Sequence, residues 1–170
     1  MSEKEYVARD LRLRYNGIFD MDDLYRKLKW WLDFNGYGDE MSNFSEARYT
    51  ERIKPEGKQI EIAWICKRPL TDYMVNFIEV TFFVVGLQKL EMQKEGKKIT
   101  SNMNKGEIEL KFSAYLLLNA SDKYNDLGIV NKIYKNFIIR DRVDQYKIDL
   151  YRKVYGMHDE AKTYLNLQKG

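Results

Sequence analysis

Two long strand candidates constrain the fold of this chain more than any other feature of its sequence. Residues 73–85 are rich in β-branched and aromatic side chains, which suit a pleated, half-buried surface. Residues 108–118 alternate along their whole length, with apolar side chains at every even position. Alternation with a period of two over such a length is a strong strand signal. The sequence therefore predicts a sheet organised around these two segments.

The second faces of these two strands are also partly apolar. Phe83 and Val85 share the odd-numbered face of the first strand, and Tyr115 and Leu117 share that of the second. Extended exposed apolar surface usually marks contact with another layer or another molecule. We therefore expect residues 141–167, a ligand or a second copy of the chain to cover this face.

A helix is predicted over residues 21–35. Asp20 suits the N-cap position, because its carboxylate can accept a hydrogen bond from a free backbone N–H of the first turn. Trp30 lies at the edge of the apolar stripe of this helix, so it is a candidate exposed contact. The residues of the buried stripe are Leu24, Leu28, Trp31 and Leu32.

An earlier strand is predicted over residues 6–15. Its polar positions include Arg12 and Arg14, which give the strand one wet, basic face. Asn16 and Gly17 follow and are typical of a turn, so the strand is expected to end there.

Residues 44–68 predict a hairpin. Both arms alternate, and residues 54–58 supply Pro and Gly for the turn between them. Residues 94–98 predict a second polar turn between the two long strands. Residues 99–104 fit either a short strand or a loop.

The C-terminal third changes to a helical period. Residues 119–126 predict a loop, and helical spacing of apolar residues begins at Leu127. Asp141 suits a cap and Gly156 suits a helix end, so we expect two helices or one kinked helix. A last short helix is predicted near residues 159–167.

Together these elements predict a single α+β domain over residues 1–170. Its sheet is an antiparallel meander of five to seven strands, with one early helix and a long or broken C-terminal helical segment packed on it. This order resembles the helix-grip arrangement of START and Bet v 1 proteins. That resemblance implies a terminal helix lying across a curved sheet over an apolar cavity. The chain departs from it by having one early helix instead of two, and by an expected break at Arg140-Asp141.

A second resemblance covers more of the chain. The segments that carry it are Leu24-Tyr25, Leu28, Trp31-Leu32, Gly36-Tyr37, 78–83, Gly86-Leu87, 104–107, Tyr134, 137–140 and Arg142. In these segments the chain is similar to an uncharacterised family of small proteins from archaeal genomes. The resemblance implies an archaeal intracellular protein and carries no activity, cofactor or catalytic residue.

Charge and cysteine content exclude several classes of protein. The net charge of +3 arises from 29 basic and 26 acidic residues, and this mixture argues against capture of nucleic acid. The longest nearly unbroken apolar run, residues 80–87, is far shorter than the roughly 20 residues of a spanning helix. Residues 1–5 are polar and have no apolar segment behind them, which argues against a signal peptide. Cys66 is the only cysteine, so the chain has no internal disulfide and suits a reducing compartment. Together these features lead us to expect a soluble cytoplasmic protein.

Residues with catalytic or metal-binding chemistry are few. His158 is the only histidine, and its charged surroundings after Gly156 predict a solvated linker residue. Asp20, Asp22 and Asp23 are explained by helix capping, and Asp39-Glu40 fits no metal-binding spacing. The sequence therefore predicts no catalytic residue, no cofactor and no metal.

The leading hypothesis is a non-enzymatic interaction or structural protein. We expect it to bind itself, as a homo-oligomer, or another protein through sheet edges and a Tyr/Arg-rich surface. The alternative is a carrier of an apolar small molecule or lipid, which needs an enclosed pocket of about 300 Å³ or more. A helix-grip enzyme that uses His158 and an RNA-binding protein rank below these. The candidate interface residues are Trp30, Phe83, Val85, Tyr115, Leu117, Arg12 and Arg14.

Overall fold

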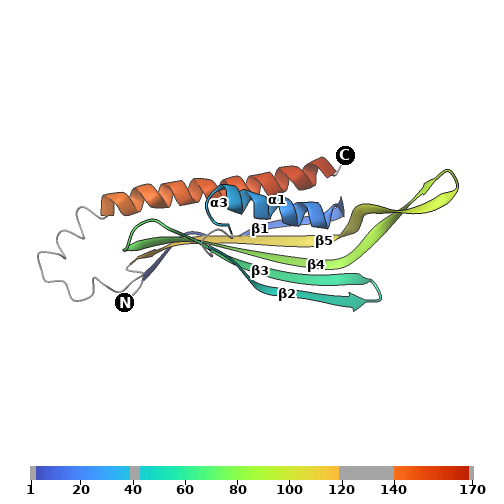
Figure 1. The fold of residues 1–170 in the computed structure, drawn as a ribbon, viewed down its shortest axis with the longest axis horizontal. Coiled ribbons are helices and arrows are strands. Elements are labelled where there is room, and N and C mark those ends of the chain that lie inside the picture. The colour runs from blue at the N-terminus through green and yellow to red at the C-terminus, as the bar shows by residue number, and fades with distance from the viewer. Residues whose placement is uncertain (1–2, 39–42, 119–139, 169–170) are drawn as a thin grey trace, which may run out of the picture.

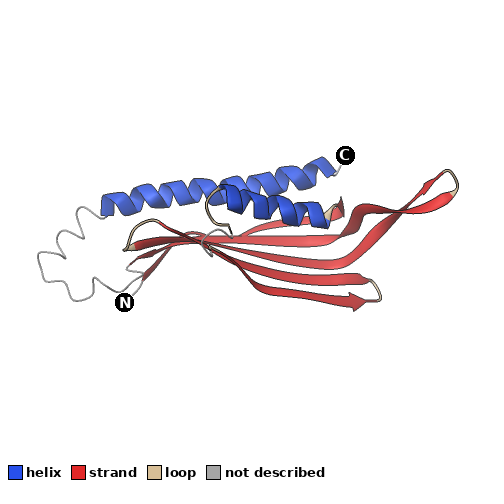
Figure 2. Cartoon of the chain, viewed as in Figure 1, coloured by secondary structure: helices blue, strands red, loops and turns tan. Residues whose placement is uncertain are grey.

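The computed structural model describes residues 3–38, 43–118 and 140–168, which form one antiparallel sheet with two helices on one of its faces (Figures 1 and 2). The sheet has five strands in the order β1-β5-β4-β3-β2. The α+β class, the early helix and the C-terminal helix packed on the sheet are thus confirmed. The elements are β1 (Glu3–Phe19), α1 (Met21–Phe34), β2 (Phe44–Lys54), β3 (Gly57–Pro69), β4 (Met74–Lys94), β5 (Lys97–Leu118) and α3 (Arg140–Gln168).

The strand order determines where α1 lies. Strands β2 to β5 follow one another as antiparallel neighbours, whereas β1 lies beyond β5 at the opposite edge from β2. The chain must therefore cross the sheet between β1 and β2, and α1 is in this connection. Figure 1 shows α1 beside α3 on the same side of the sheet.

Local signals define α1 as predicted. The Asp20 side chain accepts a hydrogen bond from the backbone N–H of Asp23 at 3.1 Å. The helix buries Leu24, Leu28 and Leu32 against the sheet. Its end is marked by Gly36, whose φ of +90° suits a residue without a Cβ.

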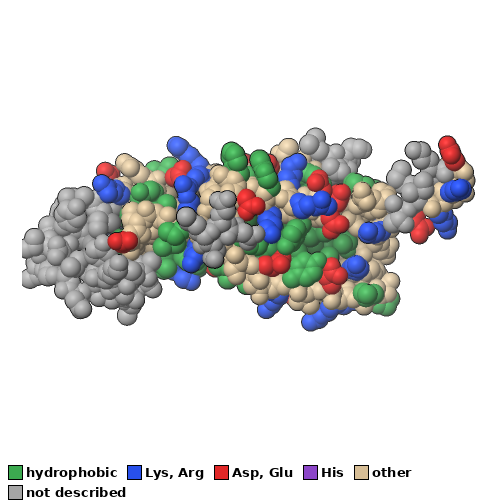
Figure 3. All heavy atoms as spheres, viewed as in Figure 1, with side chains coloured by type: hydrophobic (Ala, Val, Ile, Leu, Met, Phe, Trp, Pro, Cys, Tyr) green, Lys and Arg blue, Asp and Glu red, His purple; other side chains and the backbone are tan. Residues whose placement is uncertain are grey.

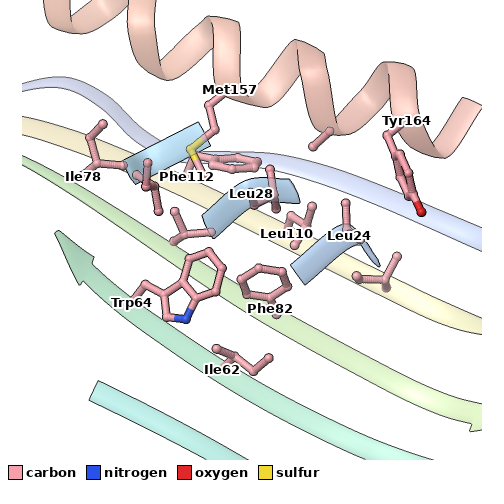
Figure 4. Packing of buried hydrophobic residues seen from close by; sticks show 14 of the residues in the cluster. Leu24, Leu28, Ile62, Trp64, Ile78, Phe82, Leu110, Phe112, Met157 and Tyr164 are labelled. Carbon is pink, nitrogen blue, oxygen red and sulfur yellow. The ribbon is translucent and has the colours of Figure 1, made fainter. Parts of the chain in front are cut away.

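The core lies between the helices and the sheet face formed by the even-numbered residues of β3, β4 and β5. Trp64 and Phe82 are almost fully buried there, with ring centroids 4.8 Å apart. Leu28 reaches this layer from α1 and Met157 reaches it from α3 (Figure 4). This face of the sheet is called the covered face below.

The C-terminal segment differs from its prediction. α3 is one continuous helix, so the expected stop at Gly156 and the separate last helix are wrong. A glycine inside a helix costs about 1 kcal/mol relative to alanine. Here Val154, Met157 and Ala161 are buried on both sides of Gly156, and their packing outweighs that cost. The predicted helical segment from Leu127 up to residue 139 lies outside the described residues.

Two strands are longer than predicted. β1 continues through Asn16 and Gly17 to Phe19, because these residues pair with Glu107 and Gly106 of β5 instead of turning. β4 likewise continues to Lys94, and residues 99–104 belong to β5. The β4–β5 hairpin extends beyond the other strands at one end of the sheet (Figure 1).

Neither described helix has the length and apolar character required to cross a membrane.

Candidate interaction surface and cleft

The sheet face turned away from both helices is the first candidate surface, called the open face below. Figure 1 shows α1 and α3 together on the other side of the sheet. None of the described elements covers this second face. Residues 141–167, which were one of the three expected covers, lie on the opposite face of the sheet. The open face is formed by Tyr6, Arg12, Arg14, Arg48, Glu61, Ala63, Ile65, Phe77, Glu79, Thr81, Phe83, Val85, Glu109, Lys111, Ser113, Tyr115 and Leu117.

Exposed apolar side chains are part of the open face. Phe83 is 44% exposed and Ile65 is 40% exposed, while Val85 and Leu117 are half-buried. Because large apolar side chains are normally covered, these residues make the face suitable for contact with another apolar surface.

One end of the open face carries an aromatic cluster centred on Tyr115. The ring of Phe77 stacks on it at a centroid distance of 5.0 Å, and that of Tyr6 lies at 5.1 Å. The Tyr115 hydroxyl donates to Glu79 Oε1 at 3.3 Å. Burial, together with the negative charge of Glu79, raises the pKa of Tyr115 to about 12.

Several charges of the open face lie close to charges of the opposite sign. Glu109 accepts a 2.7 Å hydrogen bond from Arg14 Nε, and Arg12 Nε and Lys111 Nζ lie at 3.5 and 3.7 Å from its other oxygen. Burial opposes ionisation of Glu109, but the Arg14 hydrogen bond and the nearby cations outweigh it and lower the pKa of the carboxyl. The surface is therefore mixed in sign, not uniformly basic.

Most of the predicted interface residues lie together. Arg12, Arg14, Phe83, Val85, Tyr115 and Leu117 are all on the open face. Trp30 is not, because it lies on the outer surface of α1, 59% exposed and stacked on Phe34 at 5.3 Å. Sequence reasoning missed Ile65 and Phe77, although the apolar residues on both faces of their strands were a usable signal.

The sheet edges are poor surfaces for strand pairing. β1 has two register shifts, and its Asp10 has a φ of +47° with its N–H bonded to Ser113 Oγ at 2.9 Å. β2 has a register shift after Glu46 and is almost wholly exposed, with charged side chains along it. Bulges and charges of this kind discourage edge-to-edge addition of another strand.

A cleft of about 480 Å³ beneath the first turns of α1 is the second candidate site. It is partly open to solvent, and Figure 3 shows hydrophobic side chains flanked by charged ones at the surface between α1 and the β2–β3 hairpin. The helix-grip resemblance implied a cavity under the terminal helix, whereas this cleft lies beneath α1. The cleft is lined by Met21, Asp22, Tyr25, Tyr49, Glu51, Lys58, Ile60, Ile62, Leu87, Lys89 and Asn104.

Polar contacts order one wall of the cleft. Tyr49 donates to Glu51 Oε1 at 2.7 Å, and Lys58 Nζ lies 3.8 Å from Glu51 Oε2. Burial and the Glu51 carboxylate raise the pKa of Tyr49. On the helix side, Tyr25 donates to Glu46 Oε1 at 2.7 Å. These contacts hold two tyrosine rings beside an aliphatic floor.

A buried polar pair lies within the covered face. Asn76 is 1% exposed, and its Nδ2 donates to the hydroxyl of Tyr37 at 3.3 Å. Asn76 Oδ1 has no hydrogen-bond partner among the described residues. Burial raises the pKa of Tyr37 to about 12.

His158 and Cys66, the only histidine and cysteine of the chain, both contact the apolar core. His158 is inside α3, not in a linker, and its ring packs edge-on against Phe112 at 5.8 Å. Its Nδ1 lies 3.3 Å from Asp159 Oδ1. Cys66 is fully buried. In the described ranges, no three His, Cys, Asp or Glu residues are grouped so that they could hold a metal ion.

No protein-family model matches this chain, and no curated protein matches its sequence. The two surfaces described above are therefore the basis for a functional assignment.

Proposed function

We propose that this chain is a non-enzymatic interaction protein that self-associates by packing its open face against the open face of a second copy. The observation that carries this proposal is the one-sided sheet. Both described helices lie on the covered face, while Phe83 and Ile65 remain exposed on the other. Face-to-face packing of two sheets would bury them in a layer about 10 Å thick.

The open face is large enough for a stable interface. Five strands spaced about 4.8 Å apart, over ten residues of strand length, cover roughly 800 Å². A standard interface buries about 800 Å² on each partner. The central part of the sheet alone therefore meets this requirement.

The charge pattern favours a second copy over a charged partner. Arg12, Arg14 and Lys111 all lie against the single carboxylate of Glu109, and Arg48 Nη1 lies 3.7 Å from Glu61 Oε2. A surface with both signs present attracts a polyanion such as RNA less strongly than a uniformly basic surface does. In a two-fold dimer the same patch meets itself, so a face carrying both signs can be complementary to its copy.

The face is a better candidate than the edges named in the sequence-based hypothesis. Register shifts in β1 and charged side chains on β2 oppose strand addition. A single buried cysteine also suits a reducing compartment, which supports a cytoplasmic location for the assembly.

The experiment is sedimentation velocity of the full chain from low to high micromolar concentration. We expect the unaltered protein to be a dimer. The double variant Phe83→Lys with Ile65→Lys is expected to be a monomer, because a dimer would have to bury the charge of both new lysines in its interface. Trp30→Lys, on the outer surface of α1, is the matched control and is expected to remain a dimer.

Two results would overturn the proposal. One is a purely monomeric protein at high micromolar concentration. The other is loss of the dimer in Trp30→Lys but not in the open-face variant, which would place the interface on α1.

A further inference from the structure

The cleft beneath α1 has features that self-association does not use. It lies on the covered side of the sheet, so an open-face dimer leaves it accessible. Its volume of about 480 Å³ is within the range of small-molecule sites. Its floor is aliphatic and nearly closed to solvent, formed by Ile60, Ile62 and Leu87.

A β-bulge at Gly86 brings two residues into this cleft. Val85 pairs with Glu107 but Gln88 pairs with Lys105, so β4 contains one extra residue at this point. One extra residue transfers the following side chains to the other face of the sheet. Leu87 and Lys89, which would otherwise lie on the open face with Val85, therefore line the cleft.

The bulge is held by close backbone packing. Gly57, in the β2–β3 turn, lies so near the bulge that a Cβ on it would be 2.6 Å from the carbonyl carbon of Gly86. Gln88 Nε2 also donates to the Glu56 carbonyl at 2.8 Å. The same turn carries Lys58 into the cleft, so the turn and the bulge shape one end of the site together.

The register then places one cation beside one amide. Lys89 and Asn104 are direct cross-strand partners, and both line the cleft. Asn104 is 7% exposed, and its Oδ1 accepts from the Met21 N–H at 3.1 Å. This bond orients the amide, and its nitrogen donates to no group among the described residues. Lys89 likewise has no ion pair there, whereas Lys58 is already beside Glu51.

We propose that this cleft binds a compact monocarboxylate amphiphile. Its apolar chain lies on Ile60, Ile62 and Leu87, and its carboxylate accepts from Lys89 and from the amide of Asn104. The ammonium group of Lys89 matches a single negative charge, and the Asn104 amide can donate a hydrogen bond to the same carboxylate. A doubly charged phosphate fits less well, because one uncommitted cation leaves its second charge uncompensated beside the carboxylates of Asp22 and Glu51. This site is independent of the open-face dimer.

The test uses decanoate, decanol and decylamine, three probes with the same chain length and different head groups. Binding to the full chain is measured by isothermal titration calorimetry and mapped by chemical-shift changes in the NMR spectrum. We expect decanoate to bind saturably, decanol to bind more weakly and decylamine to bind most weakly. The chemical-shift changes are expected at Ile62, Leu87 and Asn104.

Two lysine variants provide the decisive comparison. Lys89→Gln is expected to weaken decanoate binding about tenfold and to leave decanol unchanged, because it removes a charge-assisted contact. Lys67→Gln, an exposed lysine on the other face of the same sheet, is the matched control and is expected to change neither.

The proposal is overturned if no probe shows saturable binding at millimolar concentration. It is equally overturned if decanoate and decanol bind alike and Lys89→Gln changes neither. Sedimentation of the same samples reports on the dimer separately, so failure of one proposal is distinguishable from failure of the other.

Discussion

The covered and open faces of the sheet are made from the same strands, and they differ in how they are completed. On the covered face Phe82 is 1% exposed, whereas its neighbour Phe83 on the open face is 44% exposed. Two adjacent phenylalanines thus have opposite environments because consecutive side chains of a strand point to opposite faces. The difference teaches that the covered face is completed by α1 and α3, whereas no described element completes the open face.

The largest expected effect is the difference between Phe82→Ala and Phe83→Ala. Removing the Phe82 ring creates a cavity in the core, so the free energy of unfolding should fall by about 3–5 kcal/mol. Removing the Phe83 ring should cost about 1 kcal/mol or less, because much of that ring already contacts water. Urea denaturation at low micromolar protein measures both. Equal losses would mean that the open face is packed within one chain.

A second comparison concerns hydrogen-bonded tyrosines on the two faces. Tyr37→Phe removes the hydroxyl to which the buried Asn76 amide donates, so it should destabilise the protein by about 1–3 kcal/mol. Adding Asn76→Leu should recover most of that loss, because an apolar pair needs no partner. Tyr115→Phe, on the open face, leaves Glu79 accessible to water and should have a much smaller effect. A loss of equal size in Tyr115→Phe would contradict this difference between the faces.

The same tyrosines predict an alkaline transition. An unfolded tyrosine ionises near pH 10, whereas burial keeps Tyr37 protonated in the folded chain until about pH 12. Over this interval the unfolded state has lost a proton that the folded state retains, so stability falls as the pH rises. Tyr37→Phe should show a shallower fall in thermal stability between pH 10 and 12. An unchanged slope would indicate that Tyr37 ionises normally.

Glu79→Gln distinguishes the two raised tyrosine pKa values. Glu79 contributes to the raised pKa of Tyr115 but is not among the groups that act on Tyr37. Ultraviolet titration of the variant should therefore show one tyrosine ionising at lower pH and the Tyr37 step in place. The Tyr115 step should remain above the ordinary value, because burial is the larger cause.

The smallest effect is expected for Arg14→Gln. The Arg14–Glu109 hydrogen bond is short at 2.7 Å, but the Arg14 side chain is 63% exposed. Exposed ion pairs contribute little to stability, so the melting temperature of the monomer should scarcely change. Calorimetry in low and high salt checks this, and a large salt-dependent loss would show that the pair is shielded from water.

The sequence could predict elements whose signals are local. Helix α1 follows from the Asp20 cap and a leucine stripe, and β5 follows from strict alternation. The open-face cluster was also predictable, because alternation alone assigns Phe83 and Tyr115 to one side of their strands. Trp30 was included among the interface candidates only because it was expected to be exposed. It lies on α1, which crosses the covered face, so it is separated from the candidates on the open face.

Elements that depend on distant partners could not be predicted. Asn16-Gly17 has the composition of a turn, yet pairing with β5 keeps it extended. Gly156 resembles a helix end, yet burial of its neighbours carries the helix through it. The cleft was invisible in the sequence because it needs the bulge at Gly86 and side chains from five separate elements.

The pairing of β1 with β5 also has a consequence for how the chain folds. Arg14 and Glu109 are bonded although 95 positions separate them, so β1 has no sheet partner until β5 exists. The β2–β5 meander, in contrast, consists of hairpins between sequence neighbours, which form early. Closing so long a loop is slow, and docking of β1 is therefore expected to limit the folding rate. On the ribosome, the N-terminal strand waits unpaired until most of the protein has been made.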